Sequence, residues 1–156
     1  MGLVKGIYLS SEANGAMMAH SSAKLVAGRG IEGDRYFFEE GTFSKKLAGN
    51  PAREVTLMEA ENVEAFNAQF GHCYQQQDFR RNIITQGIAL NPLEGKEFFI
   101  GSVKLKGIRL CEPCAHLQQV LTEDVLPGLL SKGGLRAQIL EGGEIRVGDA
   151  VSEQSL

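Results

Sequence analysis

The fold is indicated first by the stretch EFFIGSVKL, residues 97–105. Aromatic and β-branched side chains, which favour strands, lie on both sides of Gly101-Ser102, a pair typical of tight turns. The stretch therefore predicts two short strands joined by a turn.

Outward from this stretch, other short apolar runs have the same character. Residues 3–9, 34–40 and 52–56 are strand-like, and residues 135–147 predict a hairpin around Gly142-Gly143, followed by a last strand. We expect a mostly β fold, a closed or half-closed β-barrel, because closing a sheet protects the edges of its strands.

Two or three short helices are expected beside the strands. The clearest is predicted after Thr56 and Glu59, which have the spacing of a capping box, and it ends at Gly71. Its apolar stripe has helical spacing and consists of Ala60, Val63, Phe66 and Phe70. A weaker helix is predicted over residues 122–132.

Length and composition narrow the class of protein. The 156 residues fit a single domain, residues 1–156, and the net charge of −3 argues against a general nucleic-acid-binding protein, although Arg80-Arg81 could form a local basic pocket. Three cysteines and the lack of an N-terminal targeting pattern lead us to expect reduced thiols in a cytoplasmic protein. No apolar run has the length of a membrane span, so no membrane partner is expected.

Cys114 is the candidate reactive residue. It lies in CEPCAH, residues 111–116, where a strand-like run gives way to a helix-like one. Pro113 suits the first turn of a helix, which would place Cys114 where free backbone N–H groups and the helix dipole favour a thiolate. The alternative for either cysteine is a buried packing role, and it applies more to Cys111 than to Cys114.

Residues 78–87 form a second informative stretch. Arg80 and Asn82 are alternate residues of a run that leads into β-branched positions, so a strand here would present both side chains to one ligand. A guanidinium and an amide on one side suit an anionic, hydrogen-bonding ligand. The alternative is that Arg80 forms a surface ion pair with Asp78 or Glu97.

The glycine-rich stretch GRGIEG, residues 28–33, matches the pattern of a dinucleotide-binding loop. A dinucleotide loop must open a long helix, and none is predicted here, so we interpret the glycines as a tight loop that leads into the strand-like residues 34–40. Asp34 and Arg35 at its end are either a solvated ion pair or a fork aimed at an oxyanion.

Several stretches, taken in order, resemble the MOSC domain family, named for the C-terminal domain of molybdenum-cofactor sulfurase. They are GIEGDR (residues 30–35), REVTL (53–57), RRNI (80–83) with Gly87, FIG (99–101), PCAHL (113–117), and GGL through GEIRVGD (133–149). Each is weak alone, but the ordered set, which spans about residues 3–151, is specific.

The resemblance implies a β-barrel related to the small barrel domain of pyruvate kinase. It also implies that Cys114 either ligates the molybdenum of a pterin cofactor or carries sulfur. Arg80 and Asn82 match residues that contact this cofactor in the amidoxime-reducing members, and Asp34 and Arg35 match a region near it.

The chain also departs from the family pattern. The Lys-Ser dipeptide that follows the first strand in the amidoxime-reducing members is Leu9-Ser10 here. The resemblance therefore does not extend to phosphate binding at that end. No pyridoxal-phosphate desulfurase domain is recognised in the sequence, so we expect no pyridoxal phosphate site.

The resulting hypothesis is a molybdenum-pterin protein that reduces N-hydroxylated small molecules by oxygen-atom transfer at a Cys114-ligated metal, with electrons from a redox partner protein. The alternative is a sulfur carrier or cofactor-transfer protein with a persulfide on Cys114, loaded by a sulfur donor and released by Cys111 as a disulfide. A zinc site built from Cys111, Cys114 and His116 with His72 or Cys73, and a catalytic Cys114–His116 pair, are further alternatives.

Overall fold

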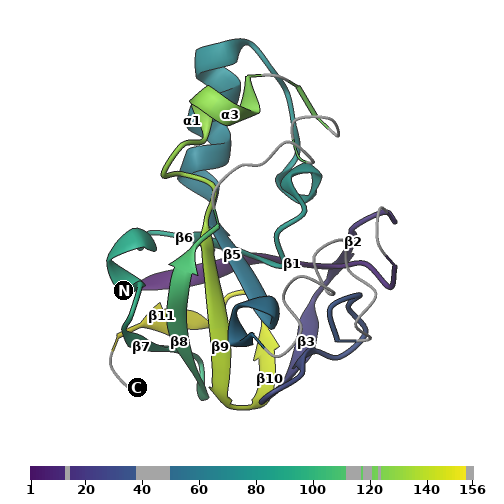
Figure 1. Ribbon diagram of the computed structural model, residues 1–156, viewed down its shortest axis with the longest axis vertical. Coiled ribbons are helices and arrows are strands. Elements are labelled where there is room, and N and C mark those ends of the chain that lie inside the picture. The colour runs from purple at the N-terminus through teal and green to yellow at the C-terminus, as the bar shows by residue number, and fades with distance from the viewer. Residues whose placement is uncertain (13–14, 38–49, 112–116, 118–120, 123, 154–156) are drawn as a thin grey trace.

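The computed structural model describes residues 1–12, 15–37, 50–111, 117, 121–122 and 124–153. Figure 1 shows a barrel of strands with helices α1 and α3 side by side beyond one end of it. We call α1 (Ala60–Phe70) and α3 (Val125–Gly128) the helical cap.

Seven strands close the barrel in the spatial order β11, β7, β8, β9, β5, β6 and β1, and β1 then pairs with β11. Their bounds are β1 (Gly2–Leu9), β5 (Val55–Glu59), β6 (Ile83–Gln86), β7 (Glu97–Ile100), β8 (Val103–Leu110), β9 (Leu135–Glu141) and β11 (Ala150–Ser152). Neighbouring strands are antiparallel except β5 and β6, which are parallel. The predicted mostly β, closed barrel is confirmed.

Shorter elements surround the barrel. Strand β2 (Met18–His20) pairs with the outer end of β1, and β10 (Gly143–Arg146), β3 (Ser22–Val26) and β4 (Gly30–Ile31) form a separate small sheet. In the described residues, α1 is accompanied by the single turn α3 and by the 3-10 helices η1 (Pro51–Arg53), η2 (Gln76–Phe79) and η3 (Asn91–Leu93).

The apolar side chains form two clusters. One fills the barrel and includes the inward residues of its strands, such as Val4, Leu57 and Ile139. The other joins the helical cap to the outside of β5 and β6, and it contains Met58, Ala60, Val63, Phe66, Phe79, Ile84, Leu117, Val125 and Leu129. The predicted stripe of α1 is therefore core, and it holds the cap on the barrel.

Some local predictions were wrong. Thr56 lies in β5 and does not cap α1; the N-cap is Glu59, which makes no side-chain capping bond. The reason is that parallel pairing with β6 continues the strand up to Glu59. The predicted end of the helix is confirmed, because Gly71 adopts the left-handed conformation with φ 71°.

Three other segments also differ from the sequence prediction. Strands β9 and β10 are not a paired hairpin, since β9 pairs with β5 and β8 while β10 pairs with β3. In the stretch 34–40, predicted to be strand-like, residues 34–37 form a bend and turns and not a strand, and residues 38–40 lie outside the described residues. Helix α3 is one turn long, and its Gly128 packs so closely on the rings of Phe66 and Phe70 that a side chain there would collide with them.

Candidate functional site

Arg80 lies at the junction of η2 and β6, with its backbone in the left-handed conformation at φ 62° and ψ 29°. It caps the 3-10 helix and precedes the strand, so the strand alternation expected for Arg80 and Asn82 does not hold at this position. A left-handed conformation in a residue other than glycine is strained, and such strain is commonly found at functional sites.

The Arg80 guanidinium is only partly satisfied. Its Nη1 donates a hydrogen bond to the Gly15 carbonyl at 2.7 Å, while Nη2 is buried with no partner in the described part of the chain. Burial, and secondarily the positive charge of Arg35, lower the pKa of Arg80 below its ordinary value.

The alternative surface ion pair for Arg80 is not what the structure shows. The Asp78 carboxylate accepts a hydrogen bond from the Gln75 backbone N–H at 2.8 Å, and Glu97 pairs with Lys104 at 3.0 Å. Neither acid forms a salt bridge with Arg80 among the described residues.

Asp34 and Arg35 are buried, so they are not a solvated pair. Arg35 Nη1 lies 3.1 Å from Asp34 Oδ1, and the same carboxylate accepts backbone hydrogen bonds from Ser10 at 3.1 Å and Tyr36 at 3.3 Å. Arg35 Nη2 reaches the Arg80 carbonyl at 3.4 Å. Asp34 thus holds Arg35, and Arg35 in turn contacts the strained residue 45 positions further along the chain.

Asn82, two residues after Arg80, links neighbouring strands through its side chain. Its Oδ1 accepts hydrogen bonds from the Thr56 backbone N–H at 3.3 Å and hydroxyl at 3.1 Å, and its Nδ2 donates to the Tyr8 carbonyl at 3.2 Å. The side chain is buried and ties β1 and β5 to the start of β6. Its predicted contact with a cofactor stays a prediction.

Arg81 connects this junction to the segment that precedes Cys114. Its buried guanidinium donates to three carbonyl oxygens, those of Gly133 at 2.9 Å, Phe79 at 3.1 Å and Cys111 at 3.3 Å. Cys114 itself lies outside the described residues. Because Cys111 is only three positions earlier, its contact with Arg81 brings the two predicted stretches into one neighbourhood.

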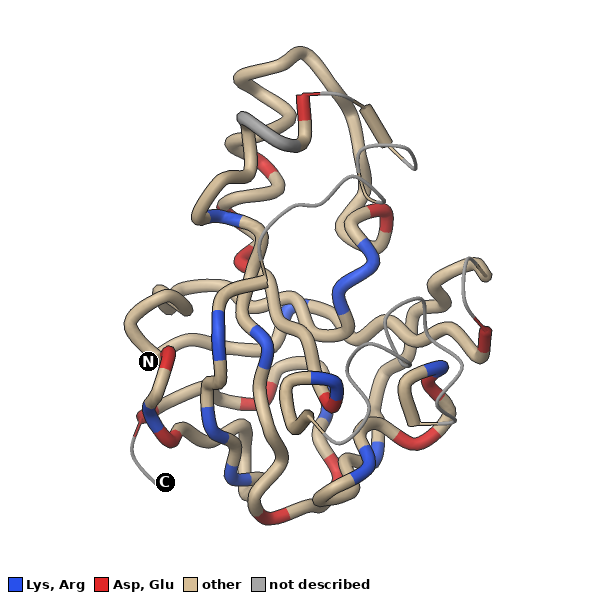
Figure 2. The backbone as a smooth tube through the Cα atoms, in the orientation of Figure 1, with Lys and Arg blue, Asp and Glu red and all other residues tan. Residues whose placement is uncertain are grey.

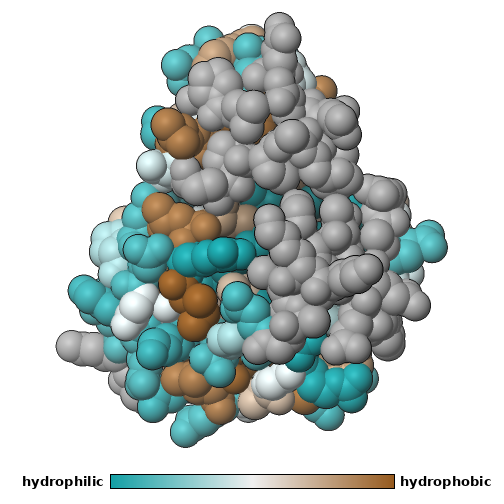
Figure 3. Space-filling model, in the orientation of Figure 1, coloured by the Kyte–Doolittle hydropathy of each residue, from teal (hydrophilic) through white to brown (hydrophobic). Residues whose placement is uncertain are grey.

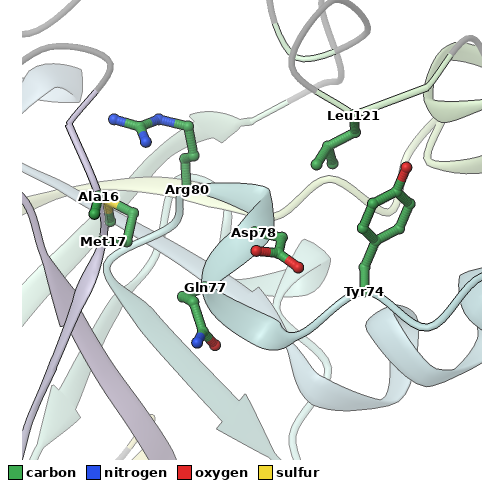
Figure 4. Close-up of a pocket in the computed structure, with 7 residues that line it drawn as sticks. All are labelled: Ala16, Met17, Tyr74, Gln77, Asp78, Arg80 and Leu121. Atoms are coloured by element: carbon green, nitrogen blue, oxygen red, sulfur yellow. The ribbon is translucent and has the colours of Figure 1, made fainter.

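A pocket of about 440 Å³ is lined by the connection between β1 and β2, by η2 with the residue after it, and by residues that follow α1 and precede α3. Figure 4 shows Ala16, Met17 and Arg80 on one side of it and Tyr74 and Leu121 on the other, with Asp78 between them. Gln77 completes the lining.

Sequence reasoning missed the lining residues Met17, Tyr74 and Asp78 as part of a site. The one available signal was an aromatic residue, Tyr74, within an otherwise polar loop. Asn67 fixes that residue, since it bonds both the Tyr74 backbone N–H at 3.1 Å and carbonyl at 2.9 Å.

No group of three or more His, Cys, Asp or Glu side chains converges on a metal position within the described ranges. Of the alternative zinc ligands, Cys73 is exposed, Cys111 is buried, and His72 bonds Asp124 at 3.1 Å. Cys114 and His116 lie outside the described residues. No described helix is long and apolar enough to cross a membrane.

The fold and the site define a small closed-barrel domain with a pocket whose charged lining residues are Arg80 and Asp78. The MOSC domain model matches residues 44–152, so the chain belongs to the MOSC domain family. The resemblance found in the sequence is thereby confirmed.

Solved structures share the fold at low sequence identity. The YuaD protein of Bacillus subtilis superposes with a TM-score of 0.81 and 16% identity, covering 96% of this chain and 93% of that chain. YiiM from Geobacillus stearothermophilus gives 0.67 and 12%, covering 97% and 72%, and YiiM from Escherichia coli gives 0.63 and 15%, covering 97% and 69%. No curated protein matches the chain.

Proposed function

We propose that this MOSC-domain protein binds a molybdenum-pterin cofactor in the pocket beside Arg80 and reduces N-hydroxylated small molecules. The observation that carries the proposal is the state of Arg80. Its backbone has a positive φ, burial lowers the pKa of its guanidinium, and the Nη2 of that group has no partner among the described residues. A buried donor without a partner costs about 1–3 kcal/mol, so a ligand that accepts its hydrogen bond would be favoured by a similar amount.

The residues present fit the phosphate of a pterin cofactor. Arg80 offers a positive charge and a donor without a partner among the described residues, and the buried Arg35, which is paired with Asp34, contacts the Arg80 backbone carbonyl. An anion relieves the repulsion between these two cations, because the charge on the ligand opposes both. A single phosphate would therefore be held by charge and by a directed hydrogen bond together.

The chain's own residues have separable roles in this proposal. Arg80 binds the anionic end of the cofactor, Arg35 and Asp34 position Arg80, and Asn82 holds the strand ends below them. Cys114 supplies a thiolate, a soft ligand that suits molybdenum. The bound group would supply a metal that exchanges an oxygen atom with the substrate and takes up electrons from a donor protein.

The side chains that line the pocket would contact the substrate. Tyr74, Met17 and Leu121 give it apolar surface that excludes water, and the Asp78 carboxylate gives it a hydrogen-bond acceptor. One oxygen of that carboxylate is already bonded to the Gln75 backbone N–H, which fixes the direction of the side chain. This combination suits a small planar molecule that carries N–H donors.

The test is the molybdenum and pterin content of protein produced in a host that makes the cofactor. Wild type should retain both, Cys114→Ala should lose the metal, and Arg80→Met should lose pterin. Cys73→Ala is the control for removal of a thiol, because Cys73 is exposed and is not among the residues that line the pocket. Its content should equal that of wild type.

Two results would overturn the proposal. Full molybdenum occupancy in Cys114→Ala would remove the assigned ligand. A wild-type protein without molybdenum but with one added sulfur atom in its intact mass, lost in Cys114→Ala, would instead establish the sulfur carrier.

A further inference from the structure

The sulfur of Met17 accepts a hydrogen bond from a buried cation at the wall of the pocket. Arg35 Nη1 donates to Met17 Sδ at 3.4 Å, and Met17 is one of the residues that line the pocket. Only 8% of Met17 is exposed, against 61% of the adjacent Met18. Met17 therefore contacts the pocket although little of its surface is open to bulk solvent.

The unpartnered donor of Arg80 lies in the same neighbourhood. Arg80 also lines the pocket, and its Nη1 donates to the carbonyl of Gly15, two residues before Met17, at 2.7 Å. Arg35 Nη2 contacts the Arg80 carbonyl at 3.4 Å, and Figure 2 shows the arginine pair as a blue segment that follows η2. Since Arg80 Nη2 has no partner among the described residues, a stronger acceptor than a thioether could use it.

Oxidation of the thioether would supply that stronger acceptor. Sulfoxide formation turns a flexible apolar side chain into a polar one, and sulfoxide reductases reverse it. In an apolar core the new oxygen would be buried without a donor, at a cost in stability. At Met17 the guanidinium groups of Arg35 and Arg80 can donate to this oxygen, so the fold accommodates the product.

We propose that Met17 is a site of oxidation by hydrogen peroxide and that its sulfoxide blocks the anion-binding end of the pocket. A lone pair of Sδ attacks one peroxide oxygen, and an S–O bond forms as the O–O bond breaks. The hydroxide that leaves takes the proton of the transferred oxygen and becomes water. Sulfur loses two electrons and peroxide gains two. The hydrogen bond from Arg35 engages one sulfur lone pair and leaves the other for the attack.

The two parts of the proposal have separate foundations. Oxidation depends on access to Met17 through the pocket and needs no cofactor. Blocking rests on the proposed function, because it takes Arg80 Nη2 to be the donor that binds the anion. Once Nη2 is bonded to the sulfoxide oxygen, that donor is no longer available to a phosphate, and the apolar wall at Met17 becomes polar.

Peptide mapping of the full-length protein after peroxide treatment tests the oxidation. Each methionine is scored by mass spectrometry for one added oxygen atom. Met18 is the exposed reference, and Figure 3 shows that small hydrophobic groups among hydrophilic ones are common on the visible face. Met58, fully buried in the second apolar cluster, is the buried reference. Met17 should be converted in the treatment that converts Met18, while Met58 stays unmodified. Met17 that stays unmodified when Met18 is fully converted would overturn the proposal.

Thermal unfolding reports whether the sulfoxide oxygen finds a donor. Met17→Leu removes the sulfur at nearly constant volume, and Met18→Leu is the matched control. The change in melting temperature caused by peroxide should agree to within about 2 °C between wild type and the two variants. A larger fall confined to the two proteins that keep Met17 would show that the oxygen is buried without a donor, and it would overturn the assigned hydrogen bonds.

Binding of inorganic phosphate, measured by titration calorimetry, tests the blocking. Peroxide treatment, followed by removal of the peroxide, should abolish phosphate binding by wild type and by Met18→Leu. The same treatment should leave Met17→Leu at its own untreated affinity. Equal phosphate affinity of wild type before and after conversion of Met17 would overturn the blocking.

Arg80→Met separates this inference from the proposed function. It should lose phosphate binding without any peroxide, because the probe reports on Arg80. Phosphate binding by Arg80→Met as strong as by wild type, or no binding by untreated wild type, would contradict the anion site of the proposed function and with it the blocking. The peptide map would still decide whether Met17 is the oxidation site.

Discussion

The two sides of the η2–β6 junction carry adjacent arginines in opposite environments. On one side Arg81 is buried, and its guanidinium donates to three carbonyl oxygens of the fold. On the other side Arg80 has a left-handed backbone. In the described residues its Nη1 donates a hydrogen bond to the Gly15 carbonyl, and its buried Nη2 has no partner.

The difference distinguishes a structural role for Arg81 from the proposed ligand-binding role of Arg80. A buried cation whose donors are satisfied fixes the segments that it joins, here η2, the residue after β8 and the turn before β9. A cation that the fold leaves strained and partly unsatisfied lowers stability unless a ligand completes it. Neighbouring residues of identical type thus have different roles, and each role can be tested.

Replacement of Arg81 by Met should have the largest effect on stability. Met keeps much of the side-chain length but leaves the Gly133, Phe79 and Cys111 carbonyls without their donor. We expect a loss of about 3 kcal/mol or more in the free energy of unfolding, measured by urea denaturation. The exposed Arg109→Met is the control and should stay within about 0.5 kcal/mol of wild type. A loss in Arg81→Met no larger than in this control would contradict the structural role.

Replacement of Arg80 by Gly should give a more stable protein than replacement by Ala. Gly adopts the left-handed conformation without strain, so Arg80→Gly should exceed Arg80→Ala in free energy of unfolding by about 1 kcal/mol. Both variants lack the guanidinium, so both should lose pterin equally, as measured by pterin fluorescence of the purified proteins. If Arg80→Gly is no more stable than Arg80→Ala, the backbone strain assigned to Arg80 does not exist.

A smaller effect on stability, one that depends on pH, is expected from the buried Glu54. Desolvation raises the pKa of its carboxyl, against the opposing hydrogen bonds from Ile139 and Gly28. The folded state therefore retains the proton to higher pH than the unfolded state does. Its contribution to stability is fully present below the unfolded pKa and is lost as pH rises through the folded pKa.

The measurement is the free energy of unfolding of wild type and Glu54→Gln from about pH 4 to pH 7, around the ordinary carboxyl range. The wild-type value minus the Glu54→Gln value should fall with rising pH and then level off. A difference that rises with pH would show that the hydrogen bonds to the carboxylate outweigh its desolvation.

Much of the fold could be predicted because its signals are local. The turn at Gly101-Ser102, the apolar stripe of α1 and its end at Gly71 each depend on residues close in sequence. The capping box at Thr56 failed because that residue pairs with Arg136 of β9, a distant segment, and so lies within a strand. The pairing of β10 with β3 instead of β9 is likewise a choice between partners that local pattern does not distinguish.

The sequence by itself determined the family, the strand-rich composition and the chemical types at the site, because these depend on which side chains occur and in what order. Only the tertiary structure decided that Arg81 is fully hydrogen-bonded, that Arg80 keeps a donor without a partner among the described residues, and that Asn82 links the strands. The physical reason is that hydrogen-bond satisfaction depends on carbonyl and amide groups from remote segments. Gly15, Thr56, Cys111 and Gly133 reach the junction only when the barrel closes.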